Sequence, residues 1–176
     1  MKRQYLYITL AAALVIFGVY WYMHNQQPKV MLETSMGNIE LQLDPRATIT
    51  TNNFLNLTKS GFYNGVIFHR VKEGFMIQAG DPTGTGSGGS GKEIPDEFVP
   101  DLSNVRGAIA MANRGPNTGS SQFFINLVDN TYLDGNYPVF GRVISGMDVV
   151  DKIGAVQTGA GDRPLQNVTI IKAYVE

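Results

Sequence analysis

The chain has 176 residues and a formal net charge of −1, with 43% hydrophobic and 16% charged residues. A chain of this length and apolar content can bury the core of one ordinary domain and carry a short appendage. Its charge shows no basic surplus of the kind that binds nucleic acid. It contains no cysteine, which excludes a disulfide framework and a zinc–thiolate site.

The amino terminus carries an uncharged apolar segment, Tyr5–Met23, behind the two cations Lys2 and Arg3. With a rise of about 1.5 Å per residue, this helix would nearly cross a hydrocarbon core of roughly 30 Å. Aromatic residues stand at both of its ends, as they do in membrane-interface belts. The alternative is a cleaved signal peptide, whose apolar region is shorter and ends at a small-residue site that this sequence lacks. We therefore predict an uncleaved transmembrane signal anchor.

The distribution of positive charge predicts the orientation of this anchor. Lys2 and Arg3 precede the apolar segment, and only Lys29 follows it closely. Because positive residues concentrate on the cytoplasmic side, the large domain is expected on the extracytoplasmic, periplasmic side of the cell (inner) membrane. The predicted parts are a cytoplasmic terminus (1–4), a single transmembrane helix (5–23), a linker (24–29) and a folded domain (30–176).

Short strand patterns separated by turn residues dominate the predicted domain. In residues 38–43, Ile39, Leu41 and Leu43 alternate with polar residues, which predicts one buried face and one wet face. Two segments, 50–59 and 147–153, have helical patterns. Strands are predicted at residues 30–34, 38–43, 66–71, 75–79, 105–111, 122–127, 139–143 and 168–175. This order favours a mainly-β closed barrel over a parallel sheet.

A glycine-rich run, Gly84–Gly91, contains a G-x-G-x-x-G pattern. Dinucleotide-binding loops with this pattern follow a strand and open a helix. Here Asp81-Pro82 precedes the run and Ile94-Pro95 follows it shortly, so neither context is present. We interpret the run as a flexible surface loop, and a nucleotide-binding function ranks far below the functions considered next.

Residues 68–81 indicate two short strands joined by a Gly-containing turn. Side chains alternate between the two faces of a strand, so Phe68 and Arg70 are expected on one face and His69 and Val71 on the other. A surface arginine beside a buried apolar pair is the simplest explanation of this pattern. The motifs that follow favour a functional explanation.

Three motifs stand in order along the domain. They are residues 68–81 (FHRVKEGFMIQAGD), residues 111–125 (MANRGPNTGSSQFFI), and Leu133-Asp134-Gly135 followed by Val139-Phe140-Gly141. Together they resemble the cyclophilins, a family of peptidyl-prolyl cis-trans isomerases, and the resemblance runs from about Val30 to Glu176. It implies the family's fold, a closed eight-stranded antiparallel barrel capped by two helices, in a chain of the shorter bacterial type.

The resemblance also implies a set of catalytic and substrate-binding residues. Arg70 would be the catalytic cation, and Gln78 would orient it. Asn113, through its backbone, and Gln122 would hold the peptide. The pocket for the proline ring would consist of Phe75, Met76, Phe124 and Leu133, with Ala112 lining the adjoining groove.

Two positions depart from the pattern of many eukaryotic members while remaining in the predicted substrate-binding set. Tyr132 stands where those members carry Trp, and Tyr137 stands where they carry His. Each keeps an aromatic body with a polar tip, so turnover of proline peptides is expected to survive. Arg114 follows Asn113 where the eukaryotic pattern often has a small residue, which leaves open the preference for side chains beyond the proline.

Prolyl isomerisation needs no nucleophile, metal or cofactor, and none is expected here. Rotation of the X–Pro amide meets a barrier of roughly 20 kcal/mol because resonance gives its C–N bond partial double-bond character. A fixed guanidinium can favour the twisted state by donating to the prolyl nitrogen. The expected partners are Pro-containing segments of unfolded or folding exported proteins, with the membrane bound through the amino-terminal helix and the protein a monomer. The alternative is a module of the same fold that binds such segments without turnover.

The anchor hypothesis predicts that the mature protein keeps its original amino terminus. Because the run Tyr5–Met23 carries no charge and no small-residue cleavage site, the full chain is expected in the membrane fraction. Amino-terminal sequencing of protein recovered from cells checks this. A first residue beyond Met23, together with release into the soluble fraction, would identify a cleaved signal peptide instead.

Overall fold

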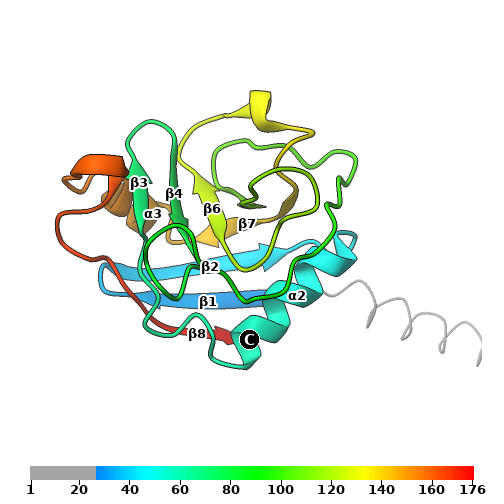
Figure 1. The fold of residues 1–176 in the computed structure, drawn as a ribbon, viewed down its shortest axis with the longest axis horizontal. Coiled ribbons are helices and arrows are strands. Elements are labelled where there is room, and N and C mark those ends of the chain that lie inside the picture. Colours follow the sequence, from blue (N-terminus) through cyan, green and yellow to red (C-terminus); the bar gives the residue numbers. More distant parts are fainter. Residues whose placement is uncertain (1–26) are drawn as a thin grey trace, which may run out of the picture.

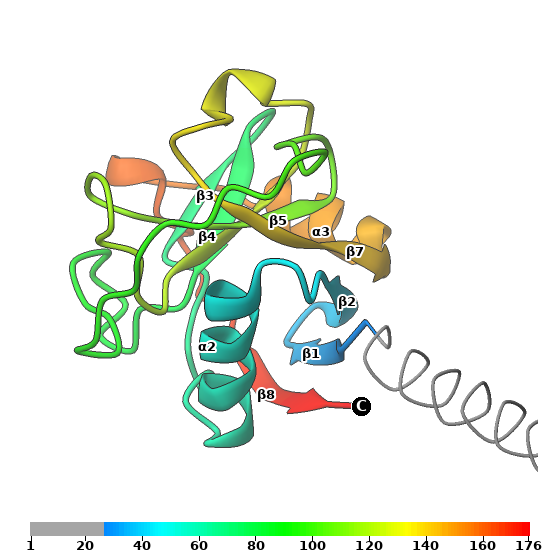
Figure 2. The same cartoon turned by 90° about the vertical axis from the view of Figure 1, so that its right-hand side faces the viewer.

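Eight antiparallel strands form one strongly curled sheet in the computed structural model, which describes residues 27–176. Figure 1 shows the strands wrapping around a common interior, and Figure 2 shows the same arrangement from the side. The strands are β1 (Lys29–Thr34), β2 (Gly37–Leu43), β3 (Arg70–Lys72), β4 (Met76–Ala79), β5 (Ala108–Met111), β6 (Phe123–Asn126), β7 (Val139–Ser145) and β8 (Ile170–Val175). Their order across the sheet is β3-β4-β6-β5-β7-β2-β1-β8.

Within residues 27–176, two α-helices accompany the sheet, as the sequence predicts. They are α2 (Thr48–Lys59), which packs against β8, and α3 (Met147–Gly154), which packs against β2 and β4. Two short 3₁₀ turns, η1 (Thr131–Leu133) and η2 (Ala160–Asp162), lie in the connections before β7 and β8. Both helices contribute buried residues to the main core inside the curled sheet, α3 toward the left and α2 toward the lower right in the view of Figure 1.

The sheet does not close into the predicted barrel. β3 and β8 lie at its two ends and are not paired with each other. A single isolated bridge, between Ile67 and Thr169, joins the segments that precede them, flanked by a 2.8 Å bond from the Phe68 N–H to the Val168 carbonyl. Two further bonds cross there, from the Gly65 N–H to the Ile170 carbonyl at 2.7 Å and from the Ile170 N–H to the Val66 carbonyl at 2.8 Å, but no continuous ladder forms, because β3 begins only at Arg70. The result is a curled half-barrel.

The side-chain alternation expected across residues 68–71 does not hold. The strand begins only at Arg70, and Phe68 and Val71 are both fully buried in the main core, whereas Arg70 is half-buried. Phe68 therefore does not share a face with Arg70. A strict two-residue period applies along a regular strand, and Phe68 precedes the first strand residue, Arg70.

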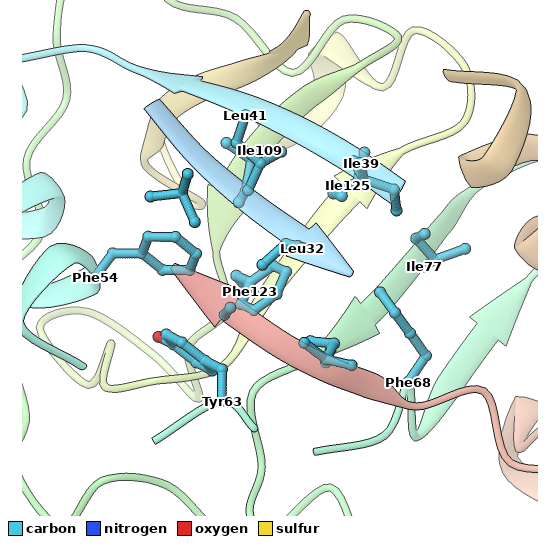
Figure 3. Packing of buried hydrophobic residues seen from close by; sticks show 14 of the residues in the cluster. Leu32, Ile39, Leu41, Phe54, Tyr63, Phe68, Ile77, Ile109, Phe123 and Ile125 are labelled. Atoms are coloured by element: carbon cyan, nitrogen blue, oxygen red, sulfur yellow. The ribbon is translucent and has the colours of Figure 1, made fainter. Parts of the chain in front are cut away.

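The main core fills the inside of the curled sheet. Its aromatic centre comes from three parts of the chain, with the Phe54 ring of α2 at 5.3 Å from Phe123 of β6 and 4.9 Å from Tyr63. Figure 3 shows these rings packed against aliphatic side chains that project from the strands. The fully buried aliphatic residues around them include Leu32, Ile39, Leu41, Ile77, Ile109 and Ile125. Their burial removes a large apolar area from water, which is the main force that curls the sheet around them.

The predicted membrane anchor, residues 5–23, lies outside the described residues, as do the cytoplasmic terminus and the first part of the linker. Within residues 27–176, no helix is long and apolar enough to cross a membrane.

The glycine-rich run is folded around one buried carboxylate, that of Asp81. This side chain accepts hydrogen bonds from the N–H groups of Thr83, Thr85, Gly86 and Gly88, at distances between 2.7 and 3.1 Å. A Cβ atom on Gly88 would lie 2.2 Å from the Asp81 carboxylate, so the absence of a side chain lets the backbone come this close. The glycines thus serve the loop's own structure, and no nucleotide is needed to explain them.

Asp81 should contribute stability that persists to low pH. Burial alone would raise the pKa of its carboxyl, but the hydrogen bonds from Thr83, Gly88 and Gly86 outweigh burial and hold that pKa well below its usual value. A lowered folded-state pKa stabilises the fold above the unfolded pKa of about 4, and the contribution is lost as the pH falls through the folded pKa. Asp81→Asn is expected to lower the free energy of unfolding by about 1–3 kcal/mol near neutral pH.

Urea unfolding of wild type and variant between pH 7 and pH 3 measures this contribution. The stability difference should stay constant down to about pH 5 and shrink below about pH 4. Asp101→Asn is the matched control, because Asp101 is exposed. Equal losses of stability in the two variants would contradict the role given to Asp81.

Candidate active site

The register of four neighbouring strands brings the central residues of the site into one row. Arg70 of β3 lies opposite Gln78 of β4, Gln78 lies opposite Phe124 of β6, and Phe124 lies opposite Ala110 of β5. Directly opposed residues of an antiparallel pair project to the same face. The row therefore carries a cation, an amide, an aromatic ring and a small apolar residue side by side on the outer face of the sheet.

Alternation along these strands divides their side chains between two apolar clusters. Val71, Ile77, Ile125 and Ile109 belong to the main core on the inner face. Their neighbours on the outer face form a second cluster: Met76, Ala108, Ala110, Phe124 and Val139, with Phe75, Leu102, Ala112, Leu133 and Tyr137 packed against it. Every residue of β5 and β6 is buried because these two clusters cover both faces of the strands.

A pocket of about 150 Å³ opens in this second cluster. Five apolar side chains, Phe75, Met76, Ala112, Phe124 and Leu133, form much of its wall, polar groups form the rest, and Arg70 is the one charged residue among those that line it. The lining residues are Arg70, Phe75, Met76, Gln78, Ala112, Asn113, Phe124, Leu133 and Tyr137. Nine of the eleven site residues predicted from the sequence thus lie around one pocket.

The other two predicted residues, Gln122 and Tyr132, lie at its borders. Gln122 lines a larger groove of about 450 Å³ that shares Gln78, Ala112 and Asn113 with the pocket. Tyr132 is 70% exposed, and its ring stacks on that of Phe75 with centroids 6.5 Å apart. It therefore extends the rim of the pocket without lining it.

Gln122 connects the sheet to the glycine-rich loop. Its Nε2 donates to the carbonyls of Gly86 and Gly88 at 3.0 and 2.7 Å, and its Oε1 accepts from Gln78 Nε2 at 2.8 Å. Both ends of this amide are therefore occupied within the protein. Gln78 lies opposite Arg70 across the strands, but its side chain donates to Gln122.

Asn113 has its backbone available at the junction of pocket and groove. Among the hydrogen bonds of residues 27–176, none uses its N–H or its C=O. Its side chain donates to the Asn136 carbonyl at 2.8 Å, which fixes the segment in place. An unpaired backbone donor and acceptor beside an apolar pocket are suited to pairing with an extended peptide.

The side chain that contacts the Arg70 guanidinium is one that sequence reasoning missed. Arg70 Nε donates to Asp162 Oδ2 at 3.2 Å, across 92 residues of sequence. Both side chains are partly exposed, at 40% for Arg70 and 36% for Asp162. No local pattern links the two positions, so only the folded chain could reveal the pair.

A buried histidine adjoins Arg70 without adding charge. His69 is 6% exposed, and neither ring nitrogen has a hydrogen-bond partner in the described part of the chain. Burial lowers the pKa of His69, Arg163 and Arg70 lower it further, and Asp81 acts in the opposite direction. The imidazole is therefore neutral at pH 7, and Arg70 is the positive group that faces the pocket.

Sequence reasoning also missed a set of buried amides beneath the pocket. Asn126 of β6 is fully buried, donates to Asn104 Oδ1 at 3.2 Å and accepts from Asn130 Nδ2 at 2.9 Å. Asn130 also donates to the Phe75 carbonyl at 3.0 Å, and Asn104 donates to the Tyr137 carbonyl at 3.2 Å. These bonds fix the backbone on two sides of the pocket.

The fold and the site together define the class of protein. A family model described as cyclophilin-type peptidyl-prolyl cis-trans isomerase/CLD matches residues 29–175. The chain belongs to this family, and its activity is the cis-trans isomerisation of peptidyl-prolyl bonds.

Known proteins with the same description resemble it over most of their length. The chain is 51% identical over 154 residues to the peptidyl-prolyl cis-trans isomerase-like 1 of Homo sapiens, covering 85% of this chain and 93% of the relative. It is 49% identical over 149 residues to the isomerase ppi1 of Schizosaccharomyces pombe, covering 82% and 96%. The crystal structure of a Cryptosporidium parvum cyclophilin-type isomerase matches with a TM-score of 0.82 at 34% identity, covering 85% and 98%.

The buried amides give a test of how the pocket is held. Asn126→Ala removes the donor to Asn104 Oδ1 and one of the two acceptors of Asn130 Nδ2, and an unsatisfied buried group costs about 1–3 kcal/mol. The variant is expected to lose stability by that amount and to raise the KM for proline peptides, because Asn130, which donates to the Phe75 carbonyl, is then held less firmly.

Denaturant unfolding and steady-state kinetics measure the two effects. Asn38→Ala is the matched control, because Asn38 is an exposed strand residue far from the pocket in sequence. An Asn126→Ala variant as stable as Asn38→Ala would show that the amides do not support the pocket.

Proposed function

We propose that Arg70 is the catalytic cation of this isomerase and that the apolar pocket beside it holds the proline ring of the substrate. The observation that carries the proposal is the row Arg70–Gln78–Phe124, in which the register places a guanidinium at the edge of an apolar pocket. A permanently charged donor at that edge can reach the prolyl nitrogen while the ring stays in the pocket.

The proposed chemistry is a hydrogen bond that strengthens as the X–Pro bond twists. In the planar amide the nitrogen lone pair is delocalised into the carbonyl and accepts poorly. Twisting localises the lone pair, so the nitrogen becomes an acceptor and the Arg70 guanidinium stabilises it. This interaction is stronger in the transition state than in the ground state, which is the condition for acceleration.

The pocket would hold one side of the rotating bond while the other side turns. Phe75, Met76, Phe124 and Leu133 surround the ring by apolar contact, and the Asn113 backbone pairs with the peptide beside it. A rate increase of about a million-fold needs about 8 kcal/mol of differential stabilisation. A partly desolvated guanidinium and a clamped peptide can share this amount.

The groove next to the pocket would receive residues that flank the proline. It is lined by both cations and anions, including Lys92, Glu93 and Arg114. We expect Gln122 to act there by holding the Gly86–Gly88 loop in place, because both ends of its amide are already bonded. Ala112 and Asn113 border both cavities and would carry the peptide from one to the other.

The setting of the activity is proposed from the sequence. The uncharged run Tyr5–Met23 behind Lys2 and Arg3 supports an anchored enzyme whose domain lies on the extracytoplasmic side of the membrane. Its substrates would then be Pro-containing segments of exported proteins during folding, where slow X–Pro isomerisation limits the rate. The protein is proposed to act as a monomer.

Replacement of Arg70 tests the proposed mechanism. Arg70→Ala removes a transition-state donor and should lower kcat/KM for a proline peptide by roughly 100- to 1000-fold in the full-length chain. Arg70→Lys should recover little, because a flexible ammonium does not reproduce the planar guanidinium.

Arg142→Ala is the matched control. Arg142 is an exposed arginine of β7 whose Nη2 donates to Gln42 Oε1 at 3.1 Å, and it does not line the pocket. This variant should keep wild-type turnover, and circular dichroism should show all variants folded. Near-normal turnover of folded Arg70→Ala would exclude Arg70 as the catalytic cation.

A further inference from the structure

Asp162, the partner of Arg70, lies on a short turn whose backbone is held by hydrogen bonds on both sides. Asp162 ends η2, which lies beside β3 in both overall views (Figures 1 and 2). The segment around it closes on itself through the Thr158–Pro164 bridge and a 2.9 Å bond from the Leu165 N–H to the Gln157 carbonyl. Its base is therefore fixed independently of Asp162.

The adjacent arginine ties the same turn to the glycine-rich loop. Arg163 Nη1 donates to the Gly84 carbonyl at 2.6 Å. Asp162 itself has a φ of 59°, in the left-handed region that Asp and Asn tolerate better than most residues. The turn thus presents one carboxylate to Arg70 from a backbone held by its own bridge and by the contact with the glycine-rich loop.

Arg70 has room to adopt other conformations. A cavity of about 340 Å³ lies next to it, lined by His69, Arg70, Gln78, Thr85, Gly86, Ala160, Gly161 and Arg163. Within residues 27–176, the bond to Asp162 is the one hydrogen bond that the Arg70 side chain makes. A long side chain beside open space and without further partners samples many rotamers.

We infer that Asp162 is a positioning residue for catalysis, which holds the guanidinium of Arg70 toward the proline pocket. By accepting from Nε, its carboxylate fixes the plane of the guanidinium and leaves both Nη groups for the substrate. It also offsets the positive charge of Arg163, the neighbouring cation at this cavity. An ion pair this exposed contributes little to stability, so its effect should fall on turnover. The inference rests on the proposed catalytic role of Arg70.

Two variants separate the carboxylate from the backbone conformation. Asp162→Gly removes the side chain and accepts the positive φ without strain. Asp162→Asn keeps an acceptor and a residue suited to positive φ, but removes the charge. In the full-length chain, Asp162→Gly should lower kcat for a proline peptide about tenfold with KM within about twofold, and Asp162→Asn should lie between it and wild type.

The pairing itself has two direct readouts. The Nε–H resonance of Arg70 in the NMR spectrum should shift and exchange faster in Asp162→Gly, because the hydrogen bond is gone. In the Arg70→Ala background, Asp162→Gly should change the residual turnover by less than about twofold, because a residue that acts through Arg70 has nothing left to position. A further tenfold fall there would overturn the inference.

Asp151→Asn is the matched control, since it disrupts the Arg106–Asp151 ion pair, which has similar exposure and does not line the pocket. It should leave kcat unchanged. If Asp162→Gly keeps the wild-type kcat while Arg70→Ala has lost turnover, the positioning role of Asp162 is refuted. Arg70 then remains the catalytic cation. Wild-type turnover in Arg70→Ala would instead refute the proposed catalytic role.

Discussion

The pairing of β3, β4, β6 and β5 in one register is the constraint on which the site depends. It places alternate residues of these strands in the main core and the others on the outer face, where the pocket lies. A slip by one residue would exchange the two sets and bury Arg70 in the place of Val71. The inner aliphatic residues therefore fix the position of Arg70 on the outer face.

Polar contacts hold the segments around the site that this strand register positions. The amide of Gln122 and the carboxylate of Asp81 each satisfy several groups of the glycine-rich loop, so the groove has a defined wall although its sequence is rich in glycine. On the other side, Asn126 and its partners hold the backbone at Phe75. Buried polar groups are stable only when they are paired, and these pairs hold segments that border the pocket or the adjoining groove.

The patterns along the chain predicted most of the secondary-structure elements. Strands and helices were placed within a few residues of their observed bounds, because alternating and helical patterns are local properties. The closed barrel and the shared face of Phe68 and Arg70 were wrong for one reason: β3 begins only at Arg70, so the residues before it do not continue the strand. Where a strand begins depends on its pairing with a neighbouring strand, which a pattern of side chains does not contain.

The sequence by itself determined the family, the candidate site residues and the separation of an apolar amino-terminal segment from a folded domain. Residues such as Phe75, Met76 and Phe124 could be named because they belong to contiguous motifs. Only the tertiary structure decided that Gln78 bonds to Gln122 and that Asp162 pairs with Arg70. Each of those contacts joins residues far apart in the chain, and a hydrogen bond depends on distance and direction in space that spacing along the sequence does not set.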